Sequence, residues 1–242
     1  MPDIVSPNAS ELIVVGAGPG DPELITLKAL NALKRADVVL YDNLANRELL
    51  SFTSEHCEKI YVGKKPYDEF TAQETIHSLI REKTKSHGLV IRLKGGDPFI
   101  FGRGYEEILY ARELGIKASF IPGITSMQAS GFEDVPLTHR NVSDGFWVMT
   151  GTKKDGALSE DLRLAIKSRA TVVIYMGMKK LAQIVRVFEE ENAGELPAMV
   201  LQHATLANKK VVKGTISAMP ALVEAAQITH PALIIVGPVA DL

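Results

Sequence analysis

The stretch ELIVVGAGPGDP, residues 11–22, decides the fold, because a short apolar run leads directly into a turn of glycine and proline. The run predicts a buried strand over residues 12–15, and leucines at helical spacing predict a helix over residues 26–35. The same alternation predicts further strands at 38–40, 60–62, 89–93, 146–149, 171–175, 199–201 and 233–236, and further helices at 71–85, 105–114, 159–167, 181–190 and 217–226. This order of elements is typical of an α/β fold with a mainly parallel sheet.

The number of these elements suits two sheets better than one. A chain of 242 residues also leaves room for two small domains. We place the boundary in the loop-like stretch 115–122. The expected organisation is a loose N-terminal arm at residues 1–10, an N-terminal α/β domain at 11–119 and a C-terminal α/β domain at 120–242.

Composition and charge exclude several classes of protein. The net charge of −2 excludes a nucleic-acid binder that works through bulk positive charge. The single cysteine, Cys57, excludes an internal disulfide and argues against a thiolate zinc site, and the six histidines are scattered, so we expect no metal. No secretory signal and no apolar stretch of the ~18 residues of a membrane span is present, which predicts a cytoplasmic protein without a membrane partner.

Ligands of open α/β sheets bind at the carboxyl ends of the strands, so residues that follow predicted strands are the first candidates for a binding site. The turn GAGPGDP, residues 16–22, is close to the dinucleotide fingerprint G-x-G-x-x-G, but Asp21 stands at the third glycine and Pro19 interrupts the turn. An acidic residue at a helix start repels phosphate, so a backbone cradle for an uncharged or cationic ligand fits better. A tight strand-to-helix turn explains the glycines equally well, and a nucleotide-dependent oxidoreductase remains an alternative.

Two charged residues also follow predicted strands. Asp42 comes directly after residues 38–40 and is either a helix N-cap, the commoner role, or a catalytic carboxylate at the mouth of the sheet. Lys64 comes just past residues 60–62, and lysines at such positions are usually solvated. Both residues are candidates for a functional role because each follows a strand of the predicted sheet.

The most informative stretch is RLKGGDPFIFGRG, residues 92–104. Gly95 and Gly96 bring bare backbone to the sheet edge, and Asp97 can accept hydrogen bonds from a ribose or an amine. The basic residues Arg92, Lys94 and Arg103 make the segment locally positive in a mildly acidic chain. We interpret it as a basic spot for a polyanionic small molecule.

Seven motifs stand in an order that resembles the tetrapyrrole methylase family, and they extend from Leu12 nearly to the C-terminus. They are VGAGPGDPELITLKAL (15–30), ADVVLYD (36–42), VGKK (62–65), RLKGGDPFIFGRG (92–104), PGITS (122–126), VPLTHR (135–140) and YMG (175–177). Because a chance match to all seven is very improbable, the resemblance outweighs the structural explanations given for single motifs.

The resemblance implies a fold, a reaction and an assembly. The fold has two α/β domains with S-adenosyl-L-methionine in the cleft between them, in a homodimer. The reaction is C-methylation of uroporphyrinogen III at C2 and C7 to precorrin-2, with S-adenosyl-L-homocysteine as the second product, on the route to siroheme, cobalamin or haem d1. A methyltransferase of the same fold that acts on a later corrin precursor is the alternative.

The resemblance also assigns roles to single residues. Asp42 and Lys64 match acid-base positions, and Arg103 matches a catalytic position that also engages the tetrapyrrole, together with Glu106 and Arg140. The positions that match cofactor contacts are Pro19, Gly95, Gly96, Asp97, Ile100, Thr125, Ser126, Met176 and Ala204.

The chain departs from the family at several of its motif positions. Tyr105 and Ala204 stand where glycine is usual, Thr152 where histidine is usual, and Lys209-Lys210 where Gln-Arg is usual. Tyr105 and Thr152 are expected to reshape the substrate side, and Ala204 to crowd the adenosine. A lysine in place of arginine keeps the charge and loses the bidentate fork.

Overall fold

The computed structural model describes residues 10–63 and 73–242. The chain divides into two compact units, Met1–Thr125 and Ser126–Leu242, and each is described by itself. The predicted arm lies outside the described residues apart from Ser10, and so does Lys64. Within the described residues, no helix is both long and apolar enough to cross a membrane.

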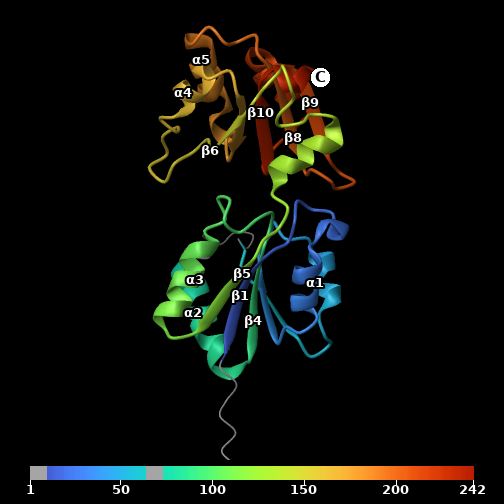
Figure 1. Ribbon diagram of the computed structural model, residues 1–242, viewed down its shortest axis with the longest axis vertical. Coiled ribbons are helices and arrows are strands. Elements are labelled where there is room, and N and C mark those ends of the chain that lie inside the picture. Colours follow the sequence, from blue (N-terminus) through green and yellow to red (C-terminus); the bar gives the residue numbers. More distant parts are fainter. Residues whose placement is uncertain (1–9, 64–72) are drawn as a thin grey trace, which may run out of the picture. The chain divides into compact units, whose positions relative to one another are not determined.

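The first unit is built on a parallel sheet (Figure 1). Its described strands are β1 (Glu11–Gly16), β2 (Val38–Tyr41), β3 (Glu58–Tyr61), β4 (Leu89–Lys94) and β5 (Lys117–Ile121), in the spatial order β3-β2-β4-β1-β5. All four strand pairs are parallel. The carboxyl ends of these strands therefore meet at one edge of the sheet, where loops from distant parts of the sequence become neighbours.

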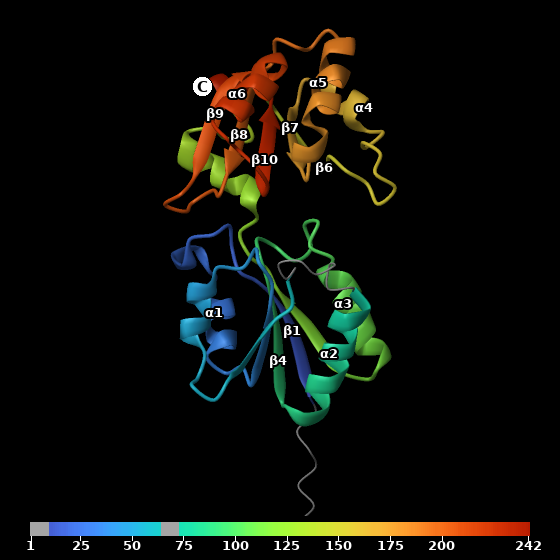
Figure 2. The same ribbon diagram turned by 180° about the vertical axis from the view of Figure 1, so that it is seen from behind.

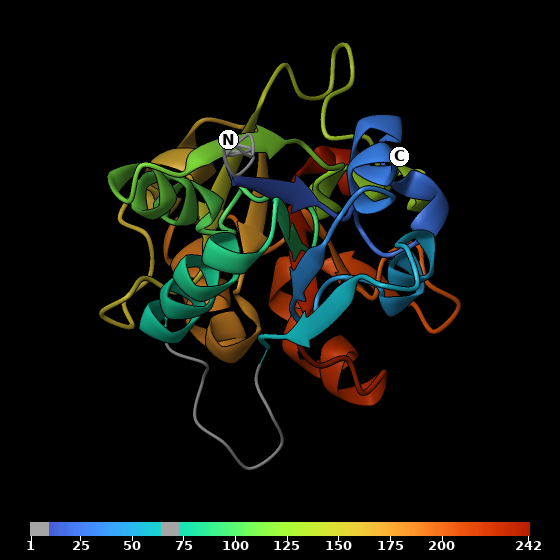
Figure 3. The same cartoon turned by 90° about the horizontal axis from the view of Figure 1, so that it is seen from below.

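Helices cover both faces of this sheet, because the strands are apolar on both sides. Helix α1 (Leu27–Leu33) packs on the face of Ile13 and Val15, whereas α2 (Gln73–Ser86) and α3 (Gly104–Glu113) pack on the opposite face. Figures 2 and 3 show the blue helix α1 and the green helices α2 and α3 on opposite sides of the strands. The first unit is thus a three-layer α/β structure.

The second unit contains a mixed sheet. Its described strands are β6 (Phe146–Thr150), β7 (Thr171–Tyr175), β8 (Pro197–Gln202), β9 (Lys210–Thr215) and β10 (Ala232–Val236), in the order β6-β7-β10-β8-β9. The β6-β7 pair is parallel, and the three pairs that involve β8 or β10 are antiparallel. The prediction of a mainly parallel sheet is therefore wrong for this unit.

One face of the second sheet is covered by α-helices and the other by 3-10 segments. Helices α4 (Leu162–Lys167), α5 (Leu181–Glu190) and α6 (Met219–Ala225) pack with Ile174 and Val200. The 3-10 segments η3 (Ser126–Glu133) and η6 (Pro238–Asp241) supply Ala129 and Val239 to the opposite face.

The structure differs from the prediction around residues 115–122. The prediction of a loop there is wrong, because Lys117–Ile121 forms β5 and pairs with β1 from Glu11 to Val15. The division of the chain falls after Thr125, whereas the sequence places it near residue 119, within β5.

Candidate functional site

Loops after four strands meet at the carboxyl edge of the first sheet. The loops after β1 and β4 exchange backbone hydrogen bonds, with Gly96 N to Gly18 O at 2.7 Å and Gly18 N to Gly96 O at 3.3 Å. A Cβ atom added to Gly123, in the loop after β5, would lie 2.3 Å from Gly96 O and 2.8 Å from the Cα of Gly16. Glycine is required here because three backbones approach more closely than any side chain allows.

Asp97 fastens two of these loops together. Its Oδ1 accepts a hydrogen bond from Phe99 N at 2.8 Å within its own loop, and its Oδ2 accepts one from Gly123 N at 3.2 Å in the loop after β5. Each carboxylate oxygen can accept a further hydrogen bond. The partly exposed Asp97 therefore both fixes the loops and keeps acceptor capacity for a ligand hydroxyl or amine.

The loop after β2 lies against the same edge. A Cβ atom added to Gly95 would stand 2.5 Å from the Cβ of Leu44, so this loop touches the loop after β4. Asp42 accepts from Leu44 N at 3.0 Å and closes a turn, while the N-cap of the next helical segment, η2 (Arg47–Phe52), is Asn46. The helix N-cap interpretation of Asp42 is therefore wrong, and its carboxylate stands at the mouth of the sheet.

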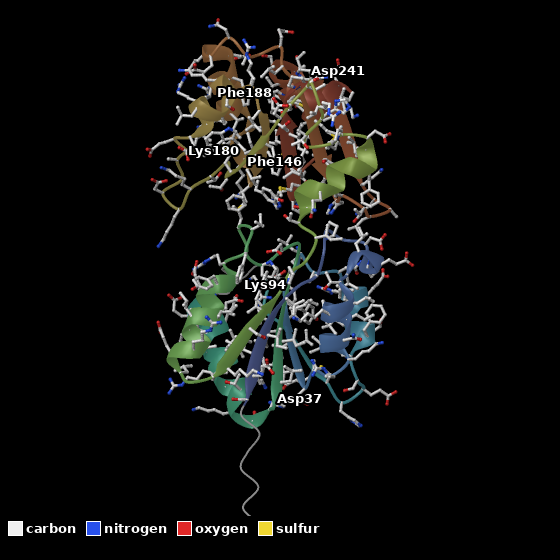
Figure 4. The ribbon with its side chains drawn as sticks, viewed as in Figure 1. Asp37, Lys94, Phe146, Lys180, Phe188 and Asp241 are labelled. Carbon is white, nitrogen blue, oxygen red and sulfur yellow. The ribbon has the colours of Figure 1, made fainter. Side chains whose placement is uncertain are left out.

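A cluster of four charged side chains, Asp42 and the buried Arg92, Lys94 and Glu107, lies at this edge. Arg92 Nη2 donates to Asp42 Oδ2 at 2.8 Å, and Glu107 Oε1 accepts from Arg92 Nε at 3.3 Å and from Lys94 Nζ at 3.1 Å. The side chains of Arg92 and Glu107 are 2% and 0% exposed. Burial and the neighbouring Arg92 lower the pKa of Lys94. Figure 4 labels Lys94 at this end of the sheet and Asp37 at the opposite end.

This cluster corrects the interpretation of residues 92–104 as a basic spot. Arg92 and Lys94 point inward, and their charges are matched by Glu107 and Asp42. Of the three basic residues that define the spot, Arg103 alone is exposed. A net charge counted along a segment does not show which face each side chain occupies.

The remaining candidates of the first unit lie in the loop between β4 and α3. Arg103 holds Glu106 in a two-pronged ion pair, with Nη2 to Oε2 at 2.6 Å and Nε to Oε1 at 3.0 Å. Both side chains are more than half exposed, and the pair raises the pKa of Arg103. Ile100 is exposed beside them, and Tyr105 is exposed with its ring edge-on to Phe99.

Phe101 and Arg103 both adopt left-handed backbone conformations, with φ of 54° and 58°. Residues other than glycine rarely adopt this conformation, and strained backbone of this kind gathers at functional sites.

Candidate site residues of the second unit also follow the carboxyl ends of strands. Strands β6, β7 and β8 run in the same direction, so Thr152, Met176 and Ala204 follow their carboxyl ends. Thr152 Oγ1 donates to Met176 O at 3.1 Å, and the exposed Met176 has a left-handed φ of 53°. Ala204 is buried. The departure at Thr152 thus contacts a candidate cofactor residue directly.

The other candidates lie at the start of η3 and on the surface of the second unit. Tyr175 Oη accepts from Met127 N at 3.0 Å, which fixes the start of η3, where the half-buried Ser126 follows the buried Thr125. Arg140 is exposed in the turn closed by the His139–Ser143 bridge. Lys209 pairs with Glu133, and Lys210 Nζ donates to Ala226 O at 3.1 Å. The side chains of both lysines therefore have partners within the second unit.

The sequence predicts several of the residues at the carboxyl edge of the first sheet and misses others. It selected Pro19, Asp42 and the segment from Gly95 to Asp97, which the structure brings together. It missed Gly123 and Glu107. Gly123 stands in the quoted motif PGITS and follows a strand that was not predicted, and Glu107 carries no signal without the knowledge that it faces the sheet.

The glycine turn after β1 is not arranged as a dinucleotide site. Asp21 caps the short segment η1 (Pro22–Leu24) by accepting from Glu23 N at 2.8 Å, and α1 begins only at Leu27. The strand order also differs from the 3-2-1-4-5-6 order of dinucleotide-binding sheets. Within residues 10–63 and 73–242, no group of three or more His, Cys, Asp or Glu side chains is placed to hold a metal ion.

Known proteins resemble this chain along most of its length. The chain is 40% identical over 235 residues to a uroporphyrinogen-III C-methyltransferase of Methanocaldococcus jannaschii, with 96% of this chain and 97% of the relative covered. It is 41% identical over 236 residues to a siroheme synthase of Chromobacterium violaceum, with 97% of this chain but only 50% of the relative covered. The chain thus spans about half the length of the siroheme synthases it matches.

A solved structure and a family match complete the comparison. The uroporphyrin-III C-methyl transferase of Thermus thermophilus complexed with S-adenyl homocysteine is 36% identical, with a TM-score of 0.83, and the match covers 96% of this chain and 99% of that one. Residues 11–220 match the family described as Tetrapyrrole (Corrin/Porphyrin) Methylases. The chain belongs to the tetrapyrrole methylases.

Proposed function

We propose that this protein transfers methyl groups from S-adenosyl-L-methionine to C2 and C7 of uroporphyrinogen III, which yields precorrin-2 and S-adenosyl-L-homocysteine. Relatives at about 40% identity carry the name of this activity, and a similar solved structure holds the homocysteine product. Precorrin-2 would feed the synthesis of siroheme, cobalamin or haem d1.

The observation that carries the proposal is the glycine-packed edge of the first sheet. Bare backbone at Gly95 and Gly96, with the Asp97 carboxylate beside it, fits a cofactor that carries hydroxyl and amine donors and no phosphate. When bound, S-adenosyl-L-methionine supplies an electrophilic methyl group on a sulfonium. The residues proposed to hold it are Pro19, Gly95, Gly96, Asp97, Ile100, Thr125, Ser126, Met176 and Ala204.

Arg103, Glu106 and Arg140 are proposed to engage the tetrapyrrole. Guanidinium groups bind carboxylates in pairs of hydrogen bonds, and the substrate carries acetate and propionate groups. The exposed pair of Arg103 with Glu106 is worth no more than about 1 kcal/mol, so a substrate carboxylate can take over Arg103 at little cost. Glu106 would then accept from pyrrole N–H groups.

Asp42 is proposed to take the proton that the pyrrole ring loses after methylation, and Lys64, outside the described residues, to act as its acid-base counterpart. The Asp42 carboxylate is 21% exposed at the sheet mouth, so it is open to a ligand on one side while Arg92 holds the other. General acid-base help of this kind is worth about 10² to 10⁴ in rate.

Incubation of the protein with uroporphyrinogen III and S-adenosyl-L-methionine tests the proposal directly. The expected result is a mass gain of two methyl groups in the tetrapyrrole, with two equivalents of S-adenosyl-L-homocysteine formed. No gain with this substrate, but methylation of a later corrin precursor, would support the alternative reaction on the same fold.

Two variants separate the cofactor side from the substrate side. Asp97→Ala should weaken binding of S-adenosyl-L-homocysteine in calorimetry, because it removes an acceptor and frees the loop of Gly123. Arg103→Ala should leave that affinity unchanged and raise KM for the tetrapyrrole. Equal effects of the two variants on both ligands would contradict this division of roles.

A homodimer in the cytoplasm is proposed as the working form. The dimer is supported by the family resemblance together with the exposed apolar side chains of Phe99, Phe101 and Leu109 around the start of α3. Light scattering coupled to size-exclusion chromatography measures the mass, and a monomer at micromolar concentration would refute the dimer.

A further inference from the structure

The cluster of four charged side chains at the mouth of the first sheet is mostly buried. It contains two cations, Arg92 and Lys94, and two anions, Asp42 and Glu107. Removing charges from water is costly, and a buried ion pair is often no more stabilising than apolar residues of similar volume. A cluster that is weak as a source of stability is better explained by what it orients.

The alternation of side chains along the strands brings the four groups together. Arg92 and Lys94 lie on the same face of β4 as Val90, which packs against α2 and α3, and Asp42 continues the register of Leu40 on β2. Glu107 comes down onto this face from the first turns of α3. Three elements therefore determine the position of one carboxylate at the sheet mouth.

Arg92 is fully committed within the protein. Its Nη2 donates to Asp42 at 2.8 Å, its Nη1 donates to Leu93 O at 2.7 Å and Leu40 O at 3.4 Å, and its Nε donates to Glu107 at 3.3 Å. With 2% of its side chain exposed, Arg92 has no surface to offer a substrate. Its effect on a ligand must pass through another residue, and among its side-chain partners Asp42 is the one that is partly exposed at the mouth of the sheet.

Asp42 is held by two bonds of different origin. The Leu44 amide donates to Oδ1 at 3.0 Å and Arg92 donates to Oδ2 at 2.8 Å, and these two bonds restrain a side chain that is still 21% exposed. Glu107 in turn keeps Arg92 in place and is shared with Lys94, while its own Oε2 has no hydrogen-bond partner among the described residues.

We infer that Arg92 is a positioning residue that aims the Asp42 carboxylate at the ligand edge, with Glu107 as the support that holds Arg92 in that pose. The inference rests on the proposed function, because it takes Asp42 as the group that accepts the proton. A lysine at position 92 would keep the charge of the cluster but has no fork to reach Asp42 and Glu107 together.

The test is a set of single-turnover methylation rates on the full chain. Arg92→Lys preserves the charge balance, and its rate should fall about tenfold, part of the 10² to 10⁴ that acid-base help supplies. The Kd for S-adenosyl-L-homocysteine and the KM for the tetrapyrrole should stay within about twofold, because Arg92 touches neither ligand. The matched control is Arg112→Lys on α3, whose guanidinium donates to Ala118 O and is remote from the cluster.

A double-mutant cycle separates positioning from general structural damage. If Arg92 acts through Asp42, Arg92→Lys should change the rate by less than about twofold in an Asp42→Asn background. Equal losses in both backgrounds, a wild-type rate for Arg92→Lys, or a wild-type rate for Asp42→Asn would each overturn the inference. A wild-type chain that binds S-adenosyl-L-homocysteine but methylates no tetrapyrrole would overturn the proposed function, and the role of Arg92 with it.

Discussion

Gly123→Ala should damage both the stability of the first unit and its binding of S-adenosyl-L-homocysteine. The new Cβ would lie 2.3 Å from Gly96 O and 2.8 Å from the Cα of Gly16, and both are backbone atoms that cannot rotate away. Ordinary contact requires the loops after β4 and β5 to separate by about 1 Å. The same displacement stretches the bond from Gly123 N to Asp97 Oδ2 beyond its present 3.2 Å.

The expected magnitude follows from these two losses. Overpacking of this kind costs about 1 to 3 kcal/mol, and a weakened hydrogen bond to a carboxylate adds to it, so we expect a loss of about 3 kcal/mol in the free energy of unfolding. Gly145→Ala is the matched control, because nothing lies within 4 Å of its added Cβ. Neither glycine has a left-handed backbone conformation, so the entropic gain of alanine in the unfolded chain is common to both variants.

Urea unfolding followed by circular dichroism measures the first quantity, and calorimetric titration with S-adenosyl-L-homocysteine measures the second. Each 1.4 kcal/mol of lost binding free energy lowers the affinity tenfold, and a loop displaced by about 1 Å should cost at least that much. If Gly123→Ala is as stable as Gly145→Ala and binds with wild-type affinity, the close packing of the loops is not what forms the site.

Three further predictions concern buried ionisable groups. Glu107→Gln should lower the free energy of unfolding by about 3 to 5 kcal/mol in urea, because it leaves two buried cations facing Asp42 alone, and a loss below about 1 kcal/mol would contradict the ion pairing. The pKa of Lys94 lies below its ordinary value of 10.5, so between that lowered pKa and 10.5 the unfolded chain binds more protons at this residue. The stability of the wild type relative to Lys94→Met should therefore rise with pH through this window, and parallel pH curves would refute this. Burial raises the pKa of the Cys57 thiol, so iodoacetamide at pH 8 should alkylate it much more slowly in the folded protein than in urea. Equal rates of alkylation would show that the thiol is accessible in the folded protein.

The strands that could be predicted are those whose residues form a short unbroken apolar run. Residues 171–175 were predicted and form β7 with the same bounds, since four of its five side chains are buried. Strands β5 and β9 were missed, and both lie at sheet edges, where polar residues and glycine replace the apolar run. Hydrophobic pattern identifies a strand by its apolar run, which the predicted edge strands β3 and β6 have and which β5 and β9 lack.

The candidate site shows the same limit at the level of single residues. Asp42 and the segment from Gly95 to Asp97 could be selected because each follows a buried parallel strand, and the carboxyl ends of such strands meet. The sequence does not predict that Arg92 and Lys94 point inward, because their burial depends on the ion pairs with Glu107, which lies on another element. A charge count along the chain treats paired and solvated cations alike.

The edge of the first sheet is held rigid by two different means, and this bears on how a methyl transferase gains rate. Close backbone contact fixes the loops of Gly16, Gly96 and Gly123, and buried ion pairing fixes Asp42. A sulfonium releases a neutral thioether, which is a good leaving group, so transfer of its methyl needs alignment of the reacting atoms more than it needs an acid. Alignment to within about 3 to 3.5 Å is worth several kcal/mol. At the glycines the loops are aligned by packing backbone against backbone, and the Asp97 carboxylate joins two of the loops. The glycines at this edge and the charges beneath it therefore serve one requirement, which is that the geometry exists before the ligands bind.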